Sequence, residues 1–357
     1  MPSPADLPLL CPVCSQPLER VGPDAPGQSR LRCSSGHSFD AARQGYYNLL
    51  VGKGTAFEAD TAGMVEARFN FLAGGHYRPL AEAVAAAVVP SLTCKPAVVL
   101  DSGTGTGHYL RVLLDHAAAA GRSVAAVGMD ISKFALRRAA RLNSEALNLV
   151  WDVWQPLPVA GNSVDAITVI FAPRNAPEFA RVLRPTGRLV VVTPRSGHLG
   201  SIARITGMLG IEEGKDSRLA AAMAPHFTAA ETLDIEFPLS LTRKEAADLA
   251  FMGPAGHHLD LSAIAGRLEN EPGTIHTEAR FRLTVFRPAE PPSVTTWPLS
   301  PHTSAAPPIG RTPALRWKDS YWPALDGASR SEGGARCLNG WAKTGGHCGS
   351  RLSSLLQ

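Results

Sequence analysis

The 357-residue sequence has no apolar run long enough to cross a lipid bilayer. Its longest apolar stretches, such as 97–100 and 189–193, have the length of a β-strand, whereas a membrane-spanning helix needs about 20 apolar residues. The segment before Cys11 has neither a basic region nor an apolar run, so no secretory signal is expected. We therefore expect a cytoplasmic protein without a membrane partner.

The sequence also lacks a strong charge of either sign. Its 35 Lys and Arg against 31 Asp and Glu give a net charge of +4, which suits an RNA partner and equally suits an ordinary enzyme. Hydrophobic residues make up 45% of the chain and charged residues 18%, as in globular proteins that bury a core. Composition thus leaves the function open.

Cysteine is scarce and unevenly placed. Of the six cysteines, Cys94 stands alone, two lie at positions 337 and 348, and the other three cluster near the N-terminus. In a chain without a secretory signal, a tight cysteine cluster indicates a metal site before a disulfide. The cluster reads Cys11-Pro-Val-Cys14, then 18 residues, then Cys33-Ser-Ser-Gly-His37.

This Cys3His pattern predicts a zinc ribbon. The first two cysteines bind one side of a tetrahedral ion, and Cys33 with His37 completes the set. Gly36 permits the tight turn before His37. Four protein ligands leave no open position, so the zinc is expected to stabilise this short segment rather than to catalyse. The segment also holds three arginines that are either phosphate contacts or solvated surface residues: Arg20, Arg30 and Arg32.

Composition divides the chain into three regions. Residues 1–55 hold the cysteine cluster, residues 56–288 alternate strand and helix patterns, and residues 289–357 are rich in Pro, Ser and Gly. The last region is expected to be a disordered tail, because its dense prolines cannot sustain a helix or a central strand. The middle region predicts a Rossmann-like α/β fold with a mostly parallel sheet. Its expected strands are 97–101, 124–129, 147–151, 164–171, 188–193 and 279–286, and its expected helices are 109–119, 133–142 and 176–183.

A glycine-rich turn follows the first of these strands and reads Asp101-Ser-Gly103-Thr-Gly105-Thr106-Gly107. Glycines at alternate positions let the backbone bend sharply and approach a ligand closely. The dinucleotide fingerprint is G-x-G-x-x-G, whereas D-x-G-x-G-x-G is typical of methyltransferases that use S-adenosylmethionine. The cofactor is then expected outside the carboxyl ends of the parallel strands.

Two further acids stand where this cofactor needs them. Asp130 ends the second strand, where a carboxylate can accept hydrogen bonds from both ribose hydroxyls. Asp152 follows the third strand, where methyltransferases of this class contact the adenine. Each acid alone is as readily an N-cap or a turn former. Together with the glycine turn, they predict a class I S-adenosylmethionine-dependent methyltransferase.

The motifs taken together resemble the bacterial 23S rRNA guanine-N1 methyltransferases, including the branch that protects producer bacteria from macrolides such as tylosin and mycinamicin. The likeness spans residues 1–288. Besides the ribbon, it is carried by Gln44-Gly-Tyr-Tyr-Asn-Leu-Leu50, Ala67-Arg68, Gly75-His-Tyr77, Gly128-Met-Asp-Ile-Ser-Lys133, Ala172-Pro173, and Thr193-Pro194 with His198.

The resemblance implies methylation of N1 of a guanine in the helix 35 loop of 23S rRNA. It implies cofactor contacts from Tyr77, Gly105, Thr106 and His198, and a homodimer whose ribbons shape an RNA-binding cleft. The target is position 748 in the resistance branch and 745 in the other. The sequence does not separate them, although the likeness to the resistance branch favours 748.

The segment Phe171-Ala-Pro-Arg174-Asn175 follows the fourth strand, where related folds place substrate-handling residues. Guanine N1 carries a proton at neutral pH, so its methylation needs a base or a stabilised anion. Arg174 is a candidate to stabilise charge at guanine O6 and Asn175 to read the base edge, with loop capping as the alternative for both. No residue is identified as the base.

Two groups of arginines are candidates for RNA contacts, although such groups more often form solvated faces: Arg137, Arg138 and Arg141, and Arg181, Arg184 and Arg188.

Two other functions remain open at this point. A small-molecule methyltransferase of an antibiotic pathway would transfer the methyl group to a metabolite in the absence of RNA. A non-catalytic RNA- or protein-binding module would have a degenerate nucleotide site, and the intact acids and glycines of the turn argue against it.

Overall fold

The computed structural model describes residues 7–23, 25, 27–52, 54–208 and 215–289. These residues belong to one compact unit, Met1–Val294. The tail expected from residue 289 onward lies almost wholly outside the described residues, which end at Ala289. Within the described ranges, no helix combines the length and the apolarity that a membrane crossing requires.

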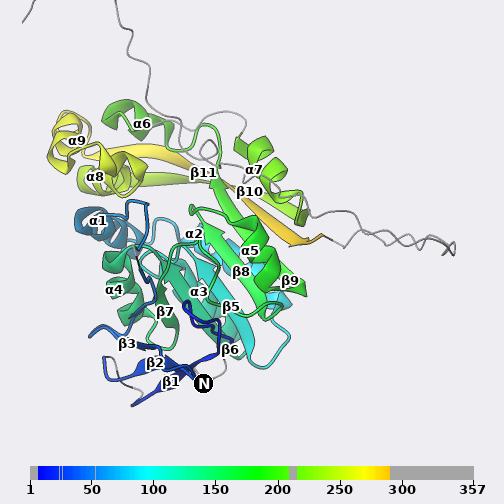
Figure 1. Ribbon diagram of the computed structural model, residues 1–357. Helices are drawn as coiled ribbons and strands as arrows, with labels where there is room; N and C mark the ends of the chain where they lie inside the picture. Colours follow the sequence, from blue (N-terminus) through cyan, green and yellow to red (C-terminus); the bar gives the residue numbers. More distant parts are fainter. Residues whose placement is uncertain (1–6, 24, 26, 53, 209–214, 290–357) are drawn as a thin grey trace, which may run out of the picture. The chain divides into compact units, whose positions relative to one another are not determined.

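Among the described residues, the central sheet contains eight strands in the order β10-β11-β9-β8-β5-β6-β7-β4 (Figure 1). The strands from β9 to β4 in this order are parallel to one another, and β11 and β10 add two antiparallel strands at one edge. The mostly parallel Rossmann-like sheet predicted from the sequence is confirmed. Its strands are β4 (Tyr47–Asn48), β5 (Ala97–Ser102), β6 (Val124–Asp130), β7 (Leu147–Val150), β8 (Val164–Ile170), β9 (Leu183–Pro194), β10 (Phe227–Thr242) and β11 (Thr274–Pro288).

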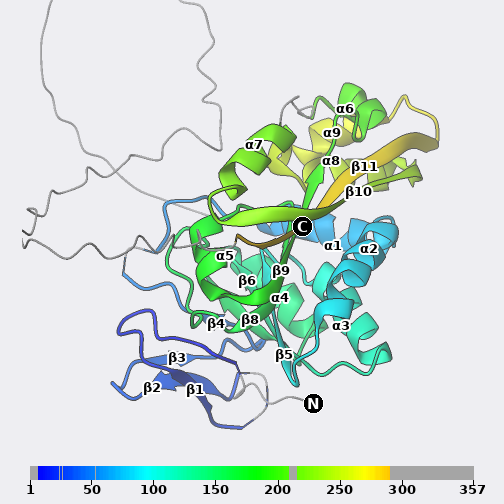
Figure 2. The ribbon, with the colours of Figure 1, turned by 90° about the vertical axis from the view of Figure 1, so that its right-hand side faces the viewer.

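Helices pack on both faces of this sheet (Figures 1 and 2). The alternation of side chains along a strand explains the two cores. In β9, Val190 and Val192 face the core that contains residues of α2, α3 and α8, whereas Leu189 and Val191 face the core that contains Phe179 of α5. The helices are α1 (Ala62–Ala73), α2 (Arg78–Val88), α3 (His108–Ala119), α4 (Lys133–Leu142), α5 (Ala176–Val182), α6 (Gly200–Thr206), α7 (Lys215–Met223), α8 (Arg243–Phe251) and α9 (Leu261–Leu268), with 3-10 turns η2 (Val89–Ser91) and η3 (Pro254–His257).

Side-chain caps fix where several helices begin. Thr61 accepts a hydrogen bond from the backbone of α1, and Ser132 does the same for α4 directly after β6. Thr242 and Glu245 form a reciprocal capping box at the start of α8. The Ser132 cap matters for the site, because it fixes the chain direction at the carboxyl end of β6.

The N-terminal segment forms a small antiparallel sheet of its own, visible as three blue strands in Figure 2: β1 (Leu18–Val21), β2 (Arg30–Cys33) and β3 (Ser38–Asp40). Two backbone hydrogen bonds connect this segment to the loop after β7, from Leu10 N to Pro158 O at 3.0 Å and from Ala160 N to Pro8 O at 2.8 Å. Leu31 of the ribbon is buried in the same core cluster as Leu157. The ribbon is therefore packed onto the methyltransferase core.

Candidate cofactor site and zinc centre

The ribbon brings four metal-ligand side chains to one point. The sulfurs of Cys11, Cys14 and Cys33 and a ring nitrogen of His37 all lie within 4.8 Å of one another. The Cys14 and Cys33 sulfurs are 3.6 Å apart, and Cys33 Sγ lies 3.4 Å from His37 Nδ1. Tetrahedral zinc with bonds of about 2.3 Å to sulfur and 2.0 Å to nitrogen places its ligand atoms at about such separations. The donor set fits a structural zinc ion.

Two tight turns hold these ligands. Ser15 adopts a left-handed φ of 58° and donates its N–H to Cys11 O at 2.8 Å, and Gly36 adopts a φ of 88° just before His37. A hydrogen bond that the Gln16 backbone N–H donates to the sulfur lowers the pKa of the Cys14 thiol to about 6, which favours the thiolate that a metal ion binds. The predicted role of Gly36 in the turn agrees with this geometry.

The ribbon arginines differ in their surroundings. Arg20 donates to the Ser29 hydroxyl at 3.1 Å, and Arg30 lies 3.6 Å from Asp40 in an exposed pair. Arg32 alternates with the buried Leu31 and points to the solvent side of β2. Phosphate contacts from these residues stay a prediction.

The glycine turn lies at the carboxyl end of β5. Both the positive φ angles and the lack of room for a Cβ favour glycine at positions 103 and 107. A Cβ on Gly103, which has a φ of 78°, would lie 2.2 Å from the Ala172 Cβ, and a Cβ on Gly107 would lie 2.5 Å from Asn143 Nδ2. The N–H groups of Gly103 and Thr104 both donate to Met129 O, at 2.8 and 2.9 Å. The turn is thus tied to the end of β6, and neighbouring side chains leave no room for a Cβ at Gly103 or Gly107.

Asp101 is buried beside this turn with one oxygen unsatisfied. Its Oδ1 accepts a hydrogen bond from the Thr168 hydroxyl at 2.6 Å, while Oδ2 has no hydrogen-bond partner among the described residues. Burial raises the pKa of this carboxyl. The Thr104 hydroxyl, which also lacks a hydrogen-bond partner, acts on this carboxyl and lowers its pKa, so the second oxygen is an acceptor for either Thr104 or a ligand donor. The turn and its orphaned acid fit the amino acid end of S-adenosylmethionine.

Asp130 is held in place by two backbone donors. Its Oδ2 accepts from Gly105 N at 2.9 Å and its Oδ1 from Ser132 N at 2.8 Å. Each carboxylate oxygen keeps a second lone pair, so the geometry leaves acceptors for two ribose hydroxyls. Burial, with the nearby charge of Asp60 adding to it, raises the pKa of Asp130 to about 6.

We expect cofactor binding to weaken as the pH falls below about 6. The ionised carboxylate of Asp130 is the better acceptor for ribose hydroxyls, and below its raised pKa a proton competes for it. Affinity should therefore be constant above neutral pH and fall by at most about tenfold per pH unit below 6. Isothermal titration calorimetry with S-adenosylmethionine measures this profile. Asp130→Asn should bind weakly at every pH, and an unchanged slope in this variant would assign the titration to another group.

Asp152 is buried under a segment of chain that precedes α1. Its Oδ2 accepts from the Thr55 hydroxyl at 2.9 Å and its Oδ1 from Trp154 N at 3.0 Å. The same segment is fixed by bonds from Gln155 Nε2 to Gly54 O and from the Ser132 hydroxyl to the backbone oxygen at residue 60, both 3.0 Å long. A hollow of 360 Å³ lies here, lined by residues that include Thr55 and Ser132. The adenine contact of Asp152 stays a prediction.

Tyr77 and His198, 121 residues apart in the chain, meet near the glycine turn. The Tyr77 ring is buried edge-on against Phe71 and Phe281, each with ring centres 5.0 Å away. Its hydroxyl lies 3.5 Å from His198 Nε2, and His198 Nδ1 accepts the Arg280 N–H at 3.0 Å. Burial lowers the pKa of His198 to about 4, so the ring is neutral and its proton resides on Nε2. His198 is thus a donor toward Tyr77.

The segment after β8 gives its two predicted substrate residues different surroundings. Asn175 caps α5, with its Oδ1 3.5 Å from Glu178 N, and its Nδ2 donates to Val153 O at 2.8 Å. This is the capping role that the sequence left open, while Arg174 is half-buried in the same loop. Roles for either in substrate handling stay predictions.

The surface arginines mostly contact acids or rings: Arg137 over Phe134, Arg138 with Glu66, Arg181 with Glu178, Arg184 with Asp165 and Arg188 with Glu231.

Arg68 belongs to the site, although the sequence reading assigned it no role. A Cβ on Gly105 would lie 3.8 Å from Arg68 Cδ, so the α1 side chain reaches over the glycine turn. Its guanidinium binds Asp60 at 2.5 Å and Met252 O at 2.6 Å, and its charge acts on Asp130. The resemblance included Ala67-Arg68 but gave no reason for it. In the structure Arg68 links α1 to Asp60 and to Met252 O while its side chain lies over Gly105, and a contact with the cofactor stays a prediction.

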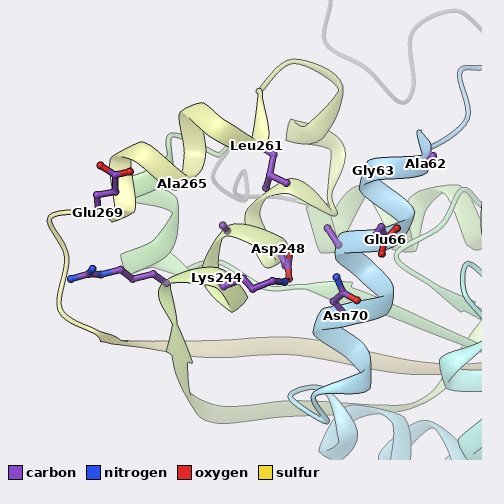
Figure 3. A pocket seen from close by; sticks show the side chains of 12 residues that line it. Ala62, Gly63, Glu66, Asn70, Lys244, Asp248, Leu261, Ala265 and Glu269 are labelled. Atoms are coloured by element: carbon purple, nitrogen blue, oxygen red, sulfur yellow. The ribbon is translucent and has the colours of Figure 1, made fainter. Parts of the chain in front are cut away.

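A groove elsewhere on the chain is distinct from this site. It has a volume of 610 Å³ and lies between α1, α8 and α9, with Glu66, Asn70 and Asp248 among the residues that point into it (Figure 3). None of the predicted cofactor residues lines it. The chemistry at the carboxyl ends of the strands, rather than the depth of a groove, therefore identifies the cofactor site.

Comparisons with known proteins agree with this arrangement. Residues 9–52 match the zinc-ribbon family described as RlmA, N-terminal, and residues 99–187 match the family described as Methyltransferase domain. A protein from Micromonospora griseorubida named as a 23S rRNA (guanine-N1)-methyltransferase is 42% identical over 295 residues, covering 78% of this chain and 97% of that protein. The 23S rRNA (guanine(748)-N1)-methyltransferase of Streptomyces fradiae is 40% identical over 282 residues, covering 78% and 96%. The predicted zinc ribbon and methyltransferase domain are confirmed.

Proposed function

The chain belongs to the 23S rRNA (guanine-N1)-methyltransferases, and we propose that it methylates N1 of guanine 748 in the helix 35 loop and so confers resistance to macrolides such as tylosin or mycinamicin. One observation carries the choice of position. The relative from Streptomyces fradiae that modifies guanine 748 is matched over 96% of its length, ribbon and cofactor domain together. Identity of 40% over nearly the whole of a relative that modifies guanine 748 supports the same target position.

We further propose how the parts divide the work. The ribbon, residues 1–55, recognises RNA, and residues 56–288 bind the cofactor and carry out the transfer, while residues 289–357 take no part in either. The net charge of +4 and the exposed Arg32 are compatible with contacts to RNA phosphates. The protein acts in the cytoplasm, where rRNA is found, and pairs as a homodimer as its family resemblance implies.

The side chains at the carboxyl ends of the strands would bind and orient the reactants. When bound, S-adenosylmethionine supplies an electrophilic methyl group next to a sulfonium charge. Asp130 would hold the ribose, and the open acceptor of Asp101 would take a donor from the amino acid end. Tyr77 and the neutral His198 would line the methionyl end. His198, with its pKa near 4, orients rather than accepts a proton. Arg174 would stabilise the negative charge that spreads to guanine O6 when N1 releases its proton to solvent water.

Transfer of a labelled methyl group from S-adenosylmethionine to unmodified 23S rRNA tests the proposal. We expect incorporation into the rRNA and a primer-extension stop at guanine 748, because N1 methylation blocks base pairing. A stop at 745 instead would keep the activity and reject the proposed position and the resistance role. Cofactor binding without incorporation into rRNA, but with transfer to a macrolide precursor, would favour a small-molecule methyltransferase.

A further inference from the structure

Phe171 has a backbone conformation that phenylalanine seldom adopts. It is the first residue after β8 and has a φ of 55°, in the left-handed region that favours glycine. Its N–H donates to Val192 O at 3.3 Å, so the conformation is fixed by the pairing of β8 with β9. Such strained residues persist where the surrounding structure imposes them, and they concentrate at functional sites.

The strained backbone places the Phe171 ring in the open, although an apolar cluster lies beside it. The side chain is 44% exposed. Its ring centre lies 5.3 Å from that of Phe281, 6.4 Å from Tyr109 and 6.5 Å from Tyr77. The ring therefore forms the outer layer of an aromatic cluster, and part of its surface is left without a partner among the described residues.

The Phe171 ring lies close to the side chains and the turn that we expect to hold the cofactor. Ala172, the next residue, packs against Gly103 of the cofactor turn. Tyr109 belongs to the first turn of α3, and Tyr77 contacts His198. Phe171 therefore lies next to the cofactor turn, through Ala172, and its ring centre is 6.5 Å from that of Tyr77 in the Tyr77–His198 pair. A planar substrate that reaches the cofactor from solvent would meet the Phe171 ring.

We propose that Phe171 is a positioning residue whose ring stacks on the target guanine and holds N1 in line with the methyl group. The inference rests on the proposed function and adds the residue that receives the base. Proteins that read single-stranded RNA stack splayed-out bases on aromatic rings, and a loop guanine is readily extruded. The left-handed conformation has a purpose in this scheme, because it directs the ring outward.

Substitutions that keep or remove the aromatic face test the proposal. Phe171→Leu keeps apolar volume, and Phe171→Gly suits the positive φ, but neither retains a flat ring. We expect both to lower kcat/KM for 23S rRNA by about 10- to 100-fold, the range that the loss of one base–aromatic stack gives. Phe171→Trp should restore most of the activity. Calorimetry should give an unchanged affinity for S-adenosylmethionine, and melting curves establish that each variant is folded.

A fluorescent base reports the contact directly. In an RNA hairpin with the helix 35 loop, 2-aminopurine replaces the target guanine, and stacking on Phe171 should quench it in the wild type and in Phe171→Trp but not in Phe171→Leu. Leu142→Ala, which alters a side chain 39% exposed at the end of α4, serves as the control and should match the wild type.

Three results would overturn the proposal. Equal activity of wild type and Phe171→Leu would remove the ring from substrate handling, and an equal loss of cofactor affinity would make Phe171 part of the cofactor site. A wild type that methylates no rRNA would reject the proposed function itself, and with it the stacked guanine. The first two results leave the proposed function intact. Failure of the stacking proposal is therefore distinguishable from failure of the proposed function.

Discussion

Removal of zinc is expected to lower methylation of 23S rRNA by at least about 100-fold while cofactor affinity changes by less than about threefold. Among the described residues, the separate sheet of the ribbon has three short strands, and structural zinc in such small segments contributes about 10–16 kcal/mol of apparent binding free energy. Without the ion, the ribbon should unfold and lose the surface that we propose binds RNA. The cofactor turn, in contrast, is held by β5 and β6.

The measurement compares chelator-treated protein and Cys14→Ser with the untreated wild type. Each is assayed for bound zinc, for affinity toward S-adenosylmethionine and for methyl transfer to 23S rRNA. Cys94→Ser is the matched control, because Cys94 lies outside the cluster and should leave zinc content and activity unchanged. Since Leu31 is buried in the core cluster shared with Leu157, a lower melting temperature is also expected. Full methylation by zinc-free protein would separate the ribbon from substrate binding.

The elements that the sequence predicted well are those with continuous apolar burial. All residues of β5, β7 and β8 are buried, and each strand appears in the sequence as a short, mostly apolar segment. Strand β10 escaped prediction, because seven successive residues after its buried first residue are exposed. It is stabilised by pairing along β11 over nearly its whole length. Such pairing is a long-range property that a local pattern does not contain.

In the candidate site, too, the features that the sequence predicted are local, and those that it missed depend on contacts between distant segments. The spacing of cysteines and glycines is a local signal, since the ligands of the ribbon and the bends of the turn come from neighbouring residues. The contact of Tyr77 with His198 and the reach of Arg68 over Gly105 depend on how distant segments pack. Only the resemblance drew attention to Tyr77 and His198. The positive φ of Phe171 has no sequence signal, because phenylalanine gives no indication of a left-handed backbone.

Replacing Asp130 by alanine is expected to weaken binding of S-adenosylmethionine by about 100-fold or more. Hydrogen bonds to a charged group contribute about 1.5–3 kcal/mol each, and the ribose would lose two of them. The substitution also leaves the N–H groups of Gly105 and Ser132 without their acceptor, so the glycine turn loses a bond that fixes its shape. Methylation at subsaturating cofactor should fall in parallel. Calorimetry gives the affinity and the labelled-methyl assay the activity.

A second acid-to-alanine variant separates loss of the cofactor contact from the general effect of removing a carboxylate on folding. Asp115→Ala removes an exposed carboxylate on α3 that pairs with Arg111 at 2.8 Å, and it should leave affinity unchanged because exposed pairs contribute little. If Asp130→Ala lowers the melting temperature but binds the cofactor normally, Asp130 acts only on the turn, through Gly105 and Ser132. If affinity falls while the fold persists, the carboxylate contacts the cofactor. The geometry favours the second result, because each Asp130 oxygen accepts one backbone N–H and keeps a lone pair for a ribose hydroxyl.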